Sequence, residues 1–133
     1  MKQEIREHSF PDETHQVGID FDGVIHRCSK GFYDGTIYDP PIEGSRQALE
    51  TISKKFDIVV YSAKARTDRP LINGMTGIEL IWEWLEKYEM SQYVKEVTAE
   101  KPRAVFYIDD KAVRFQGRWE DTFTSLQNLG YIE

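Results

Sequence analysis

The sequence predicts an α/β fold with a mainly parallel sheet and helices on both faces. Two observations support this prediction. Short apolar segments typical of buried strands alternate with longer segments in which apolar residues follow helical spacing. Two of the apolar segments also end in a pair of aspartates. Strands that alternate with helices form parallel sheets, because each helix returns the chain to the edge where the previous strand began.

The first elements follow in order along the chain. Residues 17–21 predict a short buried strand, and residues 23–41 predict a loop because they are rich in Gly, Tyr, Asp and Pro. Residues 41–56 predict a helix with Ser45 as its N-cap. The apolar face of this helix contains Ala48, Leu49 and Ile52.

The later elements continue the alternation. A strand is predicted at residues 57–62, a loop at 63–75 and a helix at 76–90, whose apolar positions are Ile78, Ile81, Trp82, Leu85 and Tyr88. Trp82 and Trp84 are two residues apart and cannot share one face, so one should be core and the other partly exposed.

The last third of the chain predicts three more elements. A weaker strand is predicted at 93–97, a strong strand at 104–110 and a final helix at 118–130 that ends at Gly130. We expect this helix to be anchored in the core by aromatic side chains, namely Phe115, Trp119 and Phe123.

Length and composition indicate one globular domain. The 133 residues divide into a polar arm at 1–16 and a single domain at 17–133, with 40% hydrophobic residues. No apolar run approaches the ~20 residues of a membrane helix, and the arm lacks the apolar stretch of a signal peptide, so we expect a cytoplasmic protein. Cys28 is the only cysteine, which excludes an internal disulfide and a Cys-rich zinc site, and we interpret it as a bystander thiol.

Four aspartates are predicted to meet at one edge of the sheet. Asp20 and Asp22 end the first strand, and Asp109 and Asp110 end the fourth. In parallel sheets, ligands bind beyond the carboxyl ends of the strands. Four carboxylates repel one another unless a cation joins them, and hard oxygen ligands favour Mg²⁺. A carboxylate is also a nucleophile that can form an aspartyl-phosphate.

Two further residues complete a predicted phosphate site. Ser62 ends the second strand, where its hydroxyl can donate a hydrogen bond to a phosphoryl oxygen. Lys101 lies shortly before the fourth strand, where its charge can neutralise the phosphate. Gly23 allows the chain to turn sharply after the first aspartate pair.

These four motifs, "DFDG", Ser62 after "IVVY", Lys101 in "EKP" and "YIDD", resemble in order those of the haloacid dehalogenase (HAD) superfamily. The resemblance runs from about Val17 to Asp110. It implies a three-layer Rossmann-like fold with the first strand central. The strand that ends at Ser62 should lie on one side of it, and the "YIDD" strand on the other.

The resemblance also implies roles for the site residues. Asp20 would be the nucleophile and a Mg²⁺ ligand, and Asp22 the general acid/base, whose backbone carbonyl also faces the metal. Asp109 and Asp110 would anchor Mg²⁺. Ser62 and Lys101 would hold the phosphoryl group, with Lys64 or Lys111 as alternatives to Lys101, since few residues separate Lys101 from Asp109. The expected substrate-binding residues are Gly23, Ser62, Ala63, Lys64 and Arg66.

The sequence therefore predicts a Mg²⁺-dependent phosphohydrolase, with two alternatives. A signalling receiver domain also uses an aspartyl-phosphate, but it carries its acidic pair on the first strand and the phosphorylated Asp in mid-chain, an order that this chain lacks. A non-catalytic Mg²⁺- or nucleotide-binding module of the same fold is disfavoured by the intact Asp20 and Asp22. His26 follows the first motif, and a position in a flap is the simpler interpretation than contact with substrate.

The gaps between the motifs indicate the substrate class. Residues 23–61 and 63–100 are too short to hold a cap domain beyond the elements that the core requires, so the site should be open. The predicted loops around it carry a basic rim, namely Lys64, Arg66, Arg69, Lys101, Arg103, Lys111 and Arg114. On a chain of net charge −6, this rim favours a nucleotide or a phosphorylated nucleic-acid end. The alternative is that these charges only balance the site aspartates. The oligomeric state is not predicted.

Overall fold

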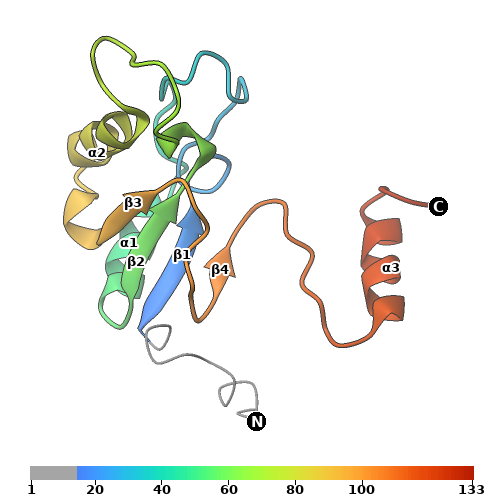
Figure 1. The fold of residues 1–133 in the computed structure, drawn as a ribbon. Coiled ribbons are helices and arrows are strands. Elements are labelled where there is room, and N and C mark those ends of the chain that lie inside the picture. Colours follow the sequence, from blue (N-terminus) through green and yellow to red (C-terminus); the bar gives the residue numbers. More distant parts are fainter. Residues whose placement is uncertain (1–14) are drawn as a thin grey trace.

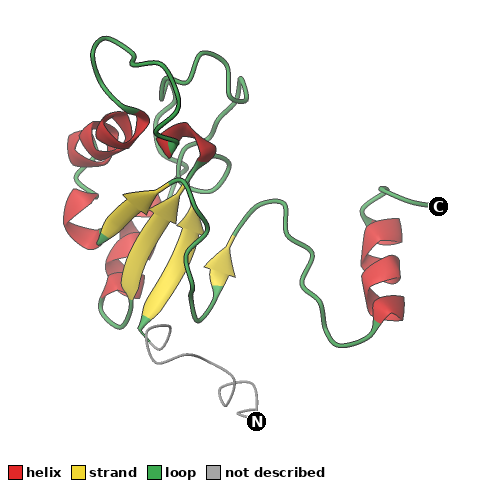
Figure 2. Ribbon diagram, in the orientation of Figure 1, coloured by secondary structure: helices red, strands yellow, loops and turns green. Residues whose placement is uncertain are grey.

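The sheet consists of four parallel strands in the order β3-β2-β1-β4 (Figures 1 and 2). A computed structural model describes residues 15–133, so residues 1–14 of the predicted arm lie outside the described residues. The strands are β1 (Gln16–Asp20), β2 (Asp57–Tyr61), β3 (Glu96–Thr98) and β4 (Tyr107–Ile108). The α-helices are α1 (Ser45–Ser53), α2 (Gly77–Lys87) and α3 (Trp119–Asn128), and two short 3₁₀ helices span Ala63–Ala65 and Ser91–Tyr93.

This strand order confirms the predicted α/β fold and the central place of β1. β1 pairs in parallel with β2 on one side and with β4 on the other. An order of 3-2-1-4 is that of the first four strands of Rossmann-type folds, whereas receiver-type folds place the second and third strands on opposite sides of the first. The chain reverses direction across the sheet between β1 and β4, and such a reversal is where ligands bind in these folds.

One face of the sheet carries the hydrophobic core. The register pairs Val17 with Ile58 and Ile19 with Val60, so these four side chains lie on the same face. Leu49 of α1 and Leu85 of α2 pack in the same buried cluster. Both helices therefore cover one face, as right-handed connections that step in one direction across a sheet require.

On the opposite face of β1, the position of Gly18 leaves no room for a side chain. Gly18 pairs with Tyr107 of β4, and a Cβ on Gly18 would lie 2.8 Å from the Tyr107 ring and 3.2 Å from Pro102. Only glycine lets the Tyr107 ring lie this close to the backbone of β1.

Helix α3 stands clear of the sheet at the end of an extended segment (Figure 1). Its expected anchors are exposed: Phe115 by 52%, Trp119 by 65% and Phe123 by 51%. The prediction that they anchor the core is therefore wrong. These rings instead contact one another at tilted angles, with centroid distances of 5.2 Å and 6.2 Å. The two helices that do pack on the sheet form one layer, so the third layer of the expected fold remains a prediction.

Three other sequence predictions change in the structure. Ser45 is the first residue of α1 rather than its N-cap, because its hydroxyl donates 2.7 Å to the Ile42 carbonyl and Gly44 occupies the cap position. The strong strand at 104–110 is only two residues long, and the weaker strand at 93–97 lies at Glu96–Thr98. Gly130 does follow the end of α3 with a φ of 81°, as predicted.

Residues 23–41 fold without a helix or a multi-residue strand, and isolated bridges tie His26 to Asp22 and to Pro41. Trp84 is 6% exposed and Trp82 is partly buried, which confirms the division expected of this pair. Within residues 15–133, no helix has the length and apolar character needed to cross a membrane.

Candidate active site

The four predicted aspartates come from the two strands that flank the reversal of the sheet. Asp20 is the last residue of β1, and Asp22 follows in the turn after it. Asp109 and Asp110 follow β4 directly. The two pairs therefore reach the same edge of the sheet from neighbouring strands, but the side chains divide into two groups with opposite surroundings.

The first group is an acidic cluster of Asp20, Asp109 and Asp110. Each offers a carboxylate oxygen, and these oxygens lie within 4.8 Å of one another. Burial raises the pKa of Asp20 to about 7, and repulsion by Asp109 and Asp110 adds to this shift. Three carboxylates this close present hard oxygen ligands with a deficit of positive charge, and this donor set fits Mg²⁺.

Neighbouring groups hold Asp109 in its ionised form. The Lys111 backbone N–H donates to its Oδ1 at 2.8 Å, and the Tyr61 hydroxyl donates to its Oδ2 at 3.0 Å. The Lys111 hydrogen bond is the main reason that the pKa of Asp109 lies below the usual range, and the Tyr61 hydrogen bond adds to it. The ionised carboxylate is the form that a metal ion needs.

Gly23 makes room for Asp110. A Cβ at residue 23 would collide with the Asp110 carboxylate, and the φ of Gly23 is +91°, a conformation that other residues rarely adopt. Glycine is therefore needed at position 23 for two reasons. The backbone has a positive φ there, and the Asp110 carboxylate, which follows β4, occupies the space of a Cβ.

The second group surrounds Asp22 with donors. Lys64 Nζ lies 3.0 Å from Asp22 Oδ1, and Ser62 Oγ donates to Oδ2 at 3.1 Å. His26 Nδ1 lies 2.9 Å from Oδ1. Burial alone would raise the pKa of Asp22, but the hydrogen bonds from His26 and Lys64 outweigh it and lower the pKa. Asp22 is therefore held as a carboxylate by buried partners.

The turn after β2 places Lys64 beneath the site. Lys64 is 2% exposed, an unusual state for lysine that its pairing with Asp22 explains. Ser62 Oγ accepts the Lys64 backbone N–H at 3.1 Å and so caps the short 3₁₀ helix. Gly77 at the start of α2 touches the Lys64 backbone so closely that a Cβ there would collide with the Lys64 carbonyl.

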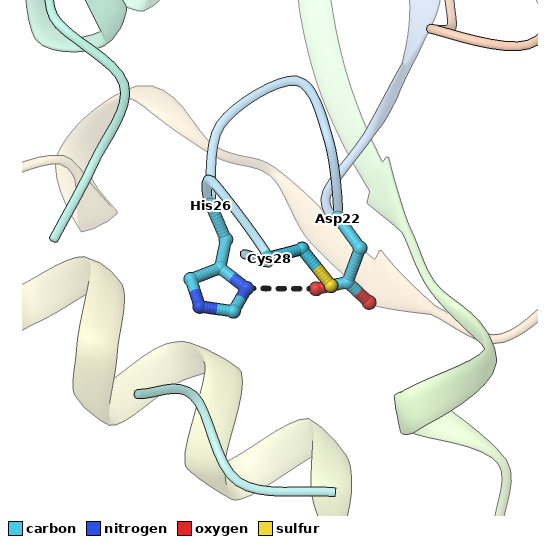
Figure 3. Close-up of side chains that lie close together, drawn as sticks. All are labelled: Asp22, His26 and Cys28. Carbon is cyan, nitrogen blue, oxygen red and sulfur yellow. Dashed lines mark hydrogen bonds and ion pairs between the residues drawn. The ribbon is translucent and has the colours of Figure 1, made fainter. Parts of the chain in front are cut away.

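Cys28 lies beside Asp22 and His26 (Figure 3). Its thiol donates 3.1 Å to the Gly31 carbonyl. One ligand atom from each of these three residues lies within 4.8 Å of the others. However, both Asp22 oxygens already accept hydrogen bonds, Oδ1 from His26 and Lys64 and Oδ2 from Ser62. Both nitrogens of His26 are engaged as well, so a metal ion would have to displace some of these partners. This arrangement does not fit a metal ion, unlike the acidic cluster.

Other predicted residues are placed less centrally. Lys101 stacks its ammonium 4.3 Å from the centroid of the Tyr107 ring and lowers the pKa of Asp109 through its charge. Lys111 Nζ is 3.4 Å from Asp110 Oδ2. Arg66 pairs with the exposed Asp68 at 2.6 Å, and Ala63 is exposed in the turn. Of the three candidate lysines, Lys64 is thus the buried one.

Sequence reasoning missed two residues that support the site. His26 is fully buried against Asp22 rather than part of an exposed flap, and Tyr61 donates to Asp109. The only signal for His26 was its position four residues after Asp22 in a glycine-containing turn. Tyr61 reads as an ordinary strand residue, because its function depends on a carboxylate 48 residues later in the chain.

Comparison with known proteins adds no family to this description. No protein-family model matches the chain, and no match was found among curated proteins or among solved structures.

Proposed function

We propose that the protein is a Mg²⁺-dependent phosphohydrolase of HAD type that hydrolyses phosphate monoesters through an aspartyl-phosphate on Asp20. The observation that carries this proposal is the division of the site. An acidic cluster that fits a divalent cation adjoins a carboxylate surrounded by a serine hydroxyl and a buried ammonium. A phosphoryl group between them would meet a nucleophile, a proton donor and positive charge.

The ion would be held by Asp20, Asp109 and Asp110, and it would supply positive charge for the phosphoryl oxygens. The expected role of Asp22 at the metal involves its backbone carbonyl and stays a prediction. Its side chain is engaged by His26, Lys64 and Ser62.

The proposed reaction has two steps. An Asp20 oxygen attacks phosphorus while the bond from phosphorus to the leaving oxygen breaks, and the leaving oxygen takes a proton from the Asp22 carboxyl. Water then attacks phosphorus and gives a proton back to Asp22. The bond from phosphorus to Asp20 breaks, and phosphate leaves.

Ser62 and Lys64 are proposed to change partners during this cycle. In the structure they donate to Asp22, but the same groups are suited to a phosphoryl oxygen. When they turn to substrate, Asp22 loses two of the hydrogen bonds that hold it ionised, which favours the protonated form that the first step needs.

The reaction can be tested with para-nitrophenyl phosphate. We expect phosphate release with Mg²⁺, none with EDTA, and a loss of at least about a thousandfold in kcat for Asp20→Asn, because an amide is a poor nucleophile. Asp57→Asn is the matched control, since Asp57 lies on β2 in an exposed pair with Lys95 at 3.7 Å. Retained activity in Asp20→Asn would refute the covalent mechanism. If no phosphate ester turns over although Mg²⁺ binds, the non-catalytic module is the better description.

We further propose a nucleotide or a phosphorylated nucleic-acid end as the substrate class. Phe32 is 36% exposed beside the site, with Lys64 Nζ 5.2 Å and the Arg69 guanidinium 4.0 Å from its ring centroid. An accessible ring beside cations suits a base attached to a phosphate. Lys64, Arg66 and Lys111 of the basic rim are already paired with carboxylates, so Phe32 and Arg69 carry this proposal rather than the rim.

A nucleoside monophosphate, a terminally phosphorylated oligonucleotide and small sugar phosphates should be compared. Phe32→Ala is expected to raise KM for the first two and to leave the sugar phosphates unchanged. A preference of the wild type for sugar phosphates would contradict this substrate class without affecting the proposed chemistry.

A further inference from the structure

We propose that His26 is a positioning residue that fixes the Asp22 carboxylate through a single tautomer of its ring. The kinetic consequence rests on the proposed function, whereas the tautomer and the contact do not. The proposal concerns the orientation of Asp22 and requires no proton to enter or leave the imidazole ring.

Hydrogen bonds on both sides of the ring determine the tautomer. The Asp39 backbone N–H donates to His26 Nε2 at 3.1 Å. A backbone N–H is only a donor, so Nε2 must act as an acceptor and carries no hydrogen. The hydrogen of the neutral ring is therefore on Nδ1, which donates 2.9 Å to Asp22 Oδ1 (Figure 3).

The ring cannot leave this position easily. His26 is 0% exposed. It stacks on Phe21 at a centroid distance of 5.5 Å and meets the edges of Trp84 at 5.8 Å and of Tyr38 at 5.0 Å. Asp39, which fixes Nε2, is itself held, because its carbonyl accepts 3.0 Å from the Trp84 indole N–H. A chain of contacts thus ties Asp22 through His26 to helix α2.

His26 differs from the two other partners of Asp22 in this respect. Ser62 and Lys64 carry groups that suit a phosphoryl oxygen, and the proposed cycle turns them to substrate. His26 has one hydrogen to donate, and that hydrogen faces Asp22. It is the partner that can keep Asp22 aimed at the leaving oxygen during proton transfer, where alignment controls the rate.

Two substitutions separate the halves of the ring. His26→Asn keeps an N–H donor near the position of Nδ1 but loses the acceptor for the Asp39 N–H. His26→Gln keeps an acceptor near the position of Nε2 but loses the donor to Asp22. Trp84→Phe tests the far end of this chain of contacts, because it removes the indole hydrogen bond that holds Asp39 and keeps both nitrogens of His26.

The kinetic test compares two leaving groups. Phenyl phosphate needs its leaving oxygen protonated, and para-nitrophenyl phosphate needs this far less. We expect His26→Gln to lower kcat/KM about 30-fold for phenyl phosphate and less than about threefold for para-nitrophenyl phosphate. The larger loss is below the roughly 100-fold or more that a general acid supplies, because Asp22 itself remains. His26→Asn should lose much less activity than His26→Gln. Trp84→Phe should show a smaller loss than His26→Gln, again greater for phenyl phosphate, because it loosens Asp39 and with it the ring. Equal losses for both esters in His26→Gln would show that His26 only supports the fold.

A second readout needs neither substrate nor metal. ¹⁵N NMR of the imidazole nitrogens should show one buried histidine with hydrogen on Nδ1, absent from His26→Asn, and its Nδ1–H signal should shift in Asp22→Asn. A ring with hydrogen on Nε2 would overturn the proposal. If the wild type hydrolyses neither ester, the proposed function fails, and the NMR result alone decides whether His26 holds Asp22.

Discussion

The N-terminal strands and helices differ from the C-terminal segment in how they support the site. The part from β1 to β3 contains the buried core and supplies Asp20, Asp22 and the buried Lys64. The part from β4 onward is largely exposed and supplies Asp109 and Asp110. Protein groups thus hold Asp22 in place, and we call this side the packed half of the site. The acidic cluster presents carboxylates that a cation would stabilise, and we call it the acidic half. The difference shows that packed partners hold the Asp22 carboxylate, whereas two of the three carboxylates in the acidic cluster come from an exposed segment.

The largest expected effect comes from comparing two substitutions that each truncate a large apolar side chain to alanine. Leu85→Ala on α2 should destabilise by about 2–5 kcal/mol, because Leu85 is 0% exposed and leaves a cavity. Phe123→Ala on α3 should cost less than about 1 kcal/mol, since Phe123 is 51% exposed. Urea unfolding of both variants measures the difference. Equal costs would mean that α3 is packed in solution.

Removal of the buried Lys64 ammonium tests the packed half of the site. Lys64→Met should destabilise the fold by about 2 kcal/mol, a discounted value because the Asp22 side chain is 24% exposed and water can replace part of the pair. Asp22 has a lowered pKa, so its contribution is present at neutral pH and is lost as pH falls through that value. The gap between Lys64→Met and wild type should therefore narrow in acid. Arg66→Met, which breaks an exposed pair, is the control.

Asp20→Asn, unlike Lys64→Met, should stabilise the metal-free protein. The pKa of Asp20 is raised to about 7 in the folded protein, so ionisation of this group lowers the stability of the fold as pH rises from about 4 to about 7. The amide cannot ionise and should raise the stability at pH 8 by about 1 kcal/mol, discounted for partial exposure. Thermal melts with EDTA at pH 5 and pH 8 check this, and a gain confined to pH 5 would contradict it.

Gly23→Ala tests the acidic half of the site. The Cβ would strain a backbone with φ of +91° and push the Asp110 carboxylate away. We expect a loss of about 1–2 kcal/mol in stability and Mg²⁺ binding weakened about tenfold or more, measured by calorimetry. Gly31→Ala is the control, because Gly31 has a φ of +65° but nothing within 4 Å of its added Cβ. Similar Mg²⁺ affinity in both variants would remove Asp110 from the ligand set.

The smallest expected effect belongs to Tyr61→Phe. Loss of the hydroxyl removes one 3.0 Å hydrogen bond to Asp109, which should cost about 0.5–1.5 kcal/mol and weaken Mg²⁺ only a few-fold. Excess Mg²⁺ should rescue this variant and part of Asp109→Asn, but not Asp22→Asn. Equal rescue of Asp22→Asn would mean that Asp22 belongs with the metal ligands.

The sequence predicted the packed region well and the exposed region poorly, for a physical reason. Apolar periodicity reports which face of a segment is buried, so the strand at Val17, the helix at Leu85 and the edge of the sheet that carries Asp20 were all predictable. The same signal failed for Trp119 and Phe123, which are aromatic but exposed. Periodicity shows that a helix has an apolar face and does not show what covers it.

The contacts of the Asp22 side chain were not predicted, although two of its partners were named for another role. Ser62, and Lys64 as an alternative to Lys101, were expected to hold the phosphoryl group. Lys64 reaches Asp22 from a short 3₁₀ helix in which its side chain is buried. The contact of His26 depends on the turn at Gly23, which has a φ of +91° and whose N–H donates to the His26 carbonyl at 2.7 Å. Such contacts arise from loop geometry, on which residue type gives little information.

Gly18 has a consequence for how this protein tolerates mutation. In a library of all substitutions, position 18 should accept almost nothing, although glycine offers no functional group and does not touch the aspartates. Any added carbon would press on Tyr107, and Tyr107 begins the two-residue strand that leads directly into Asp109. A screen for activity would therefore score Gly18 among the most sensitive positions. That score would reflect the space that the residue leaves empty.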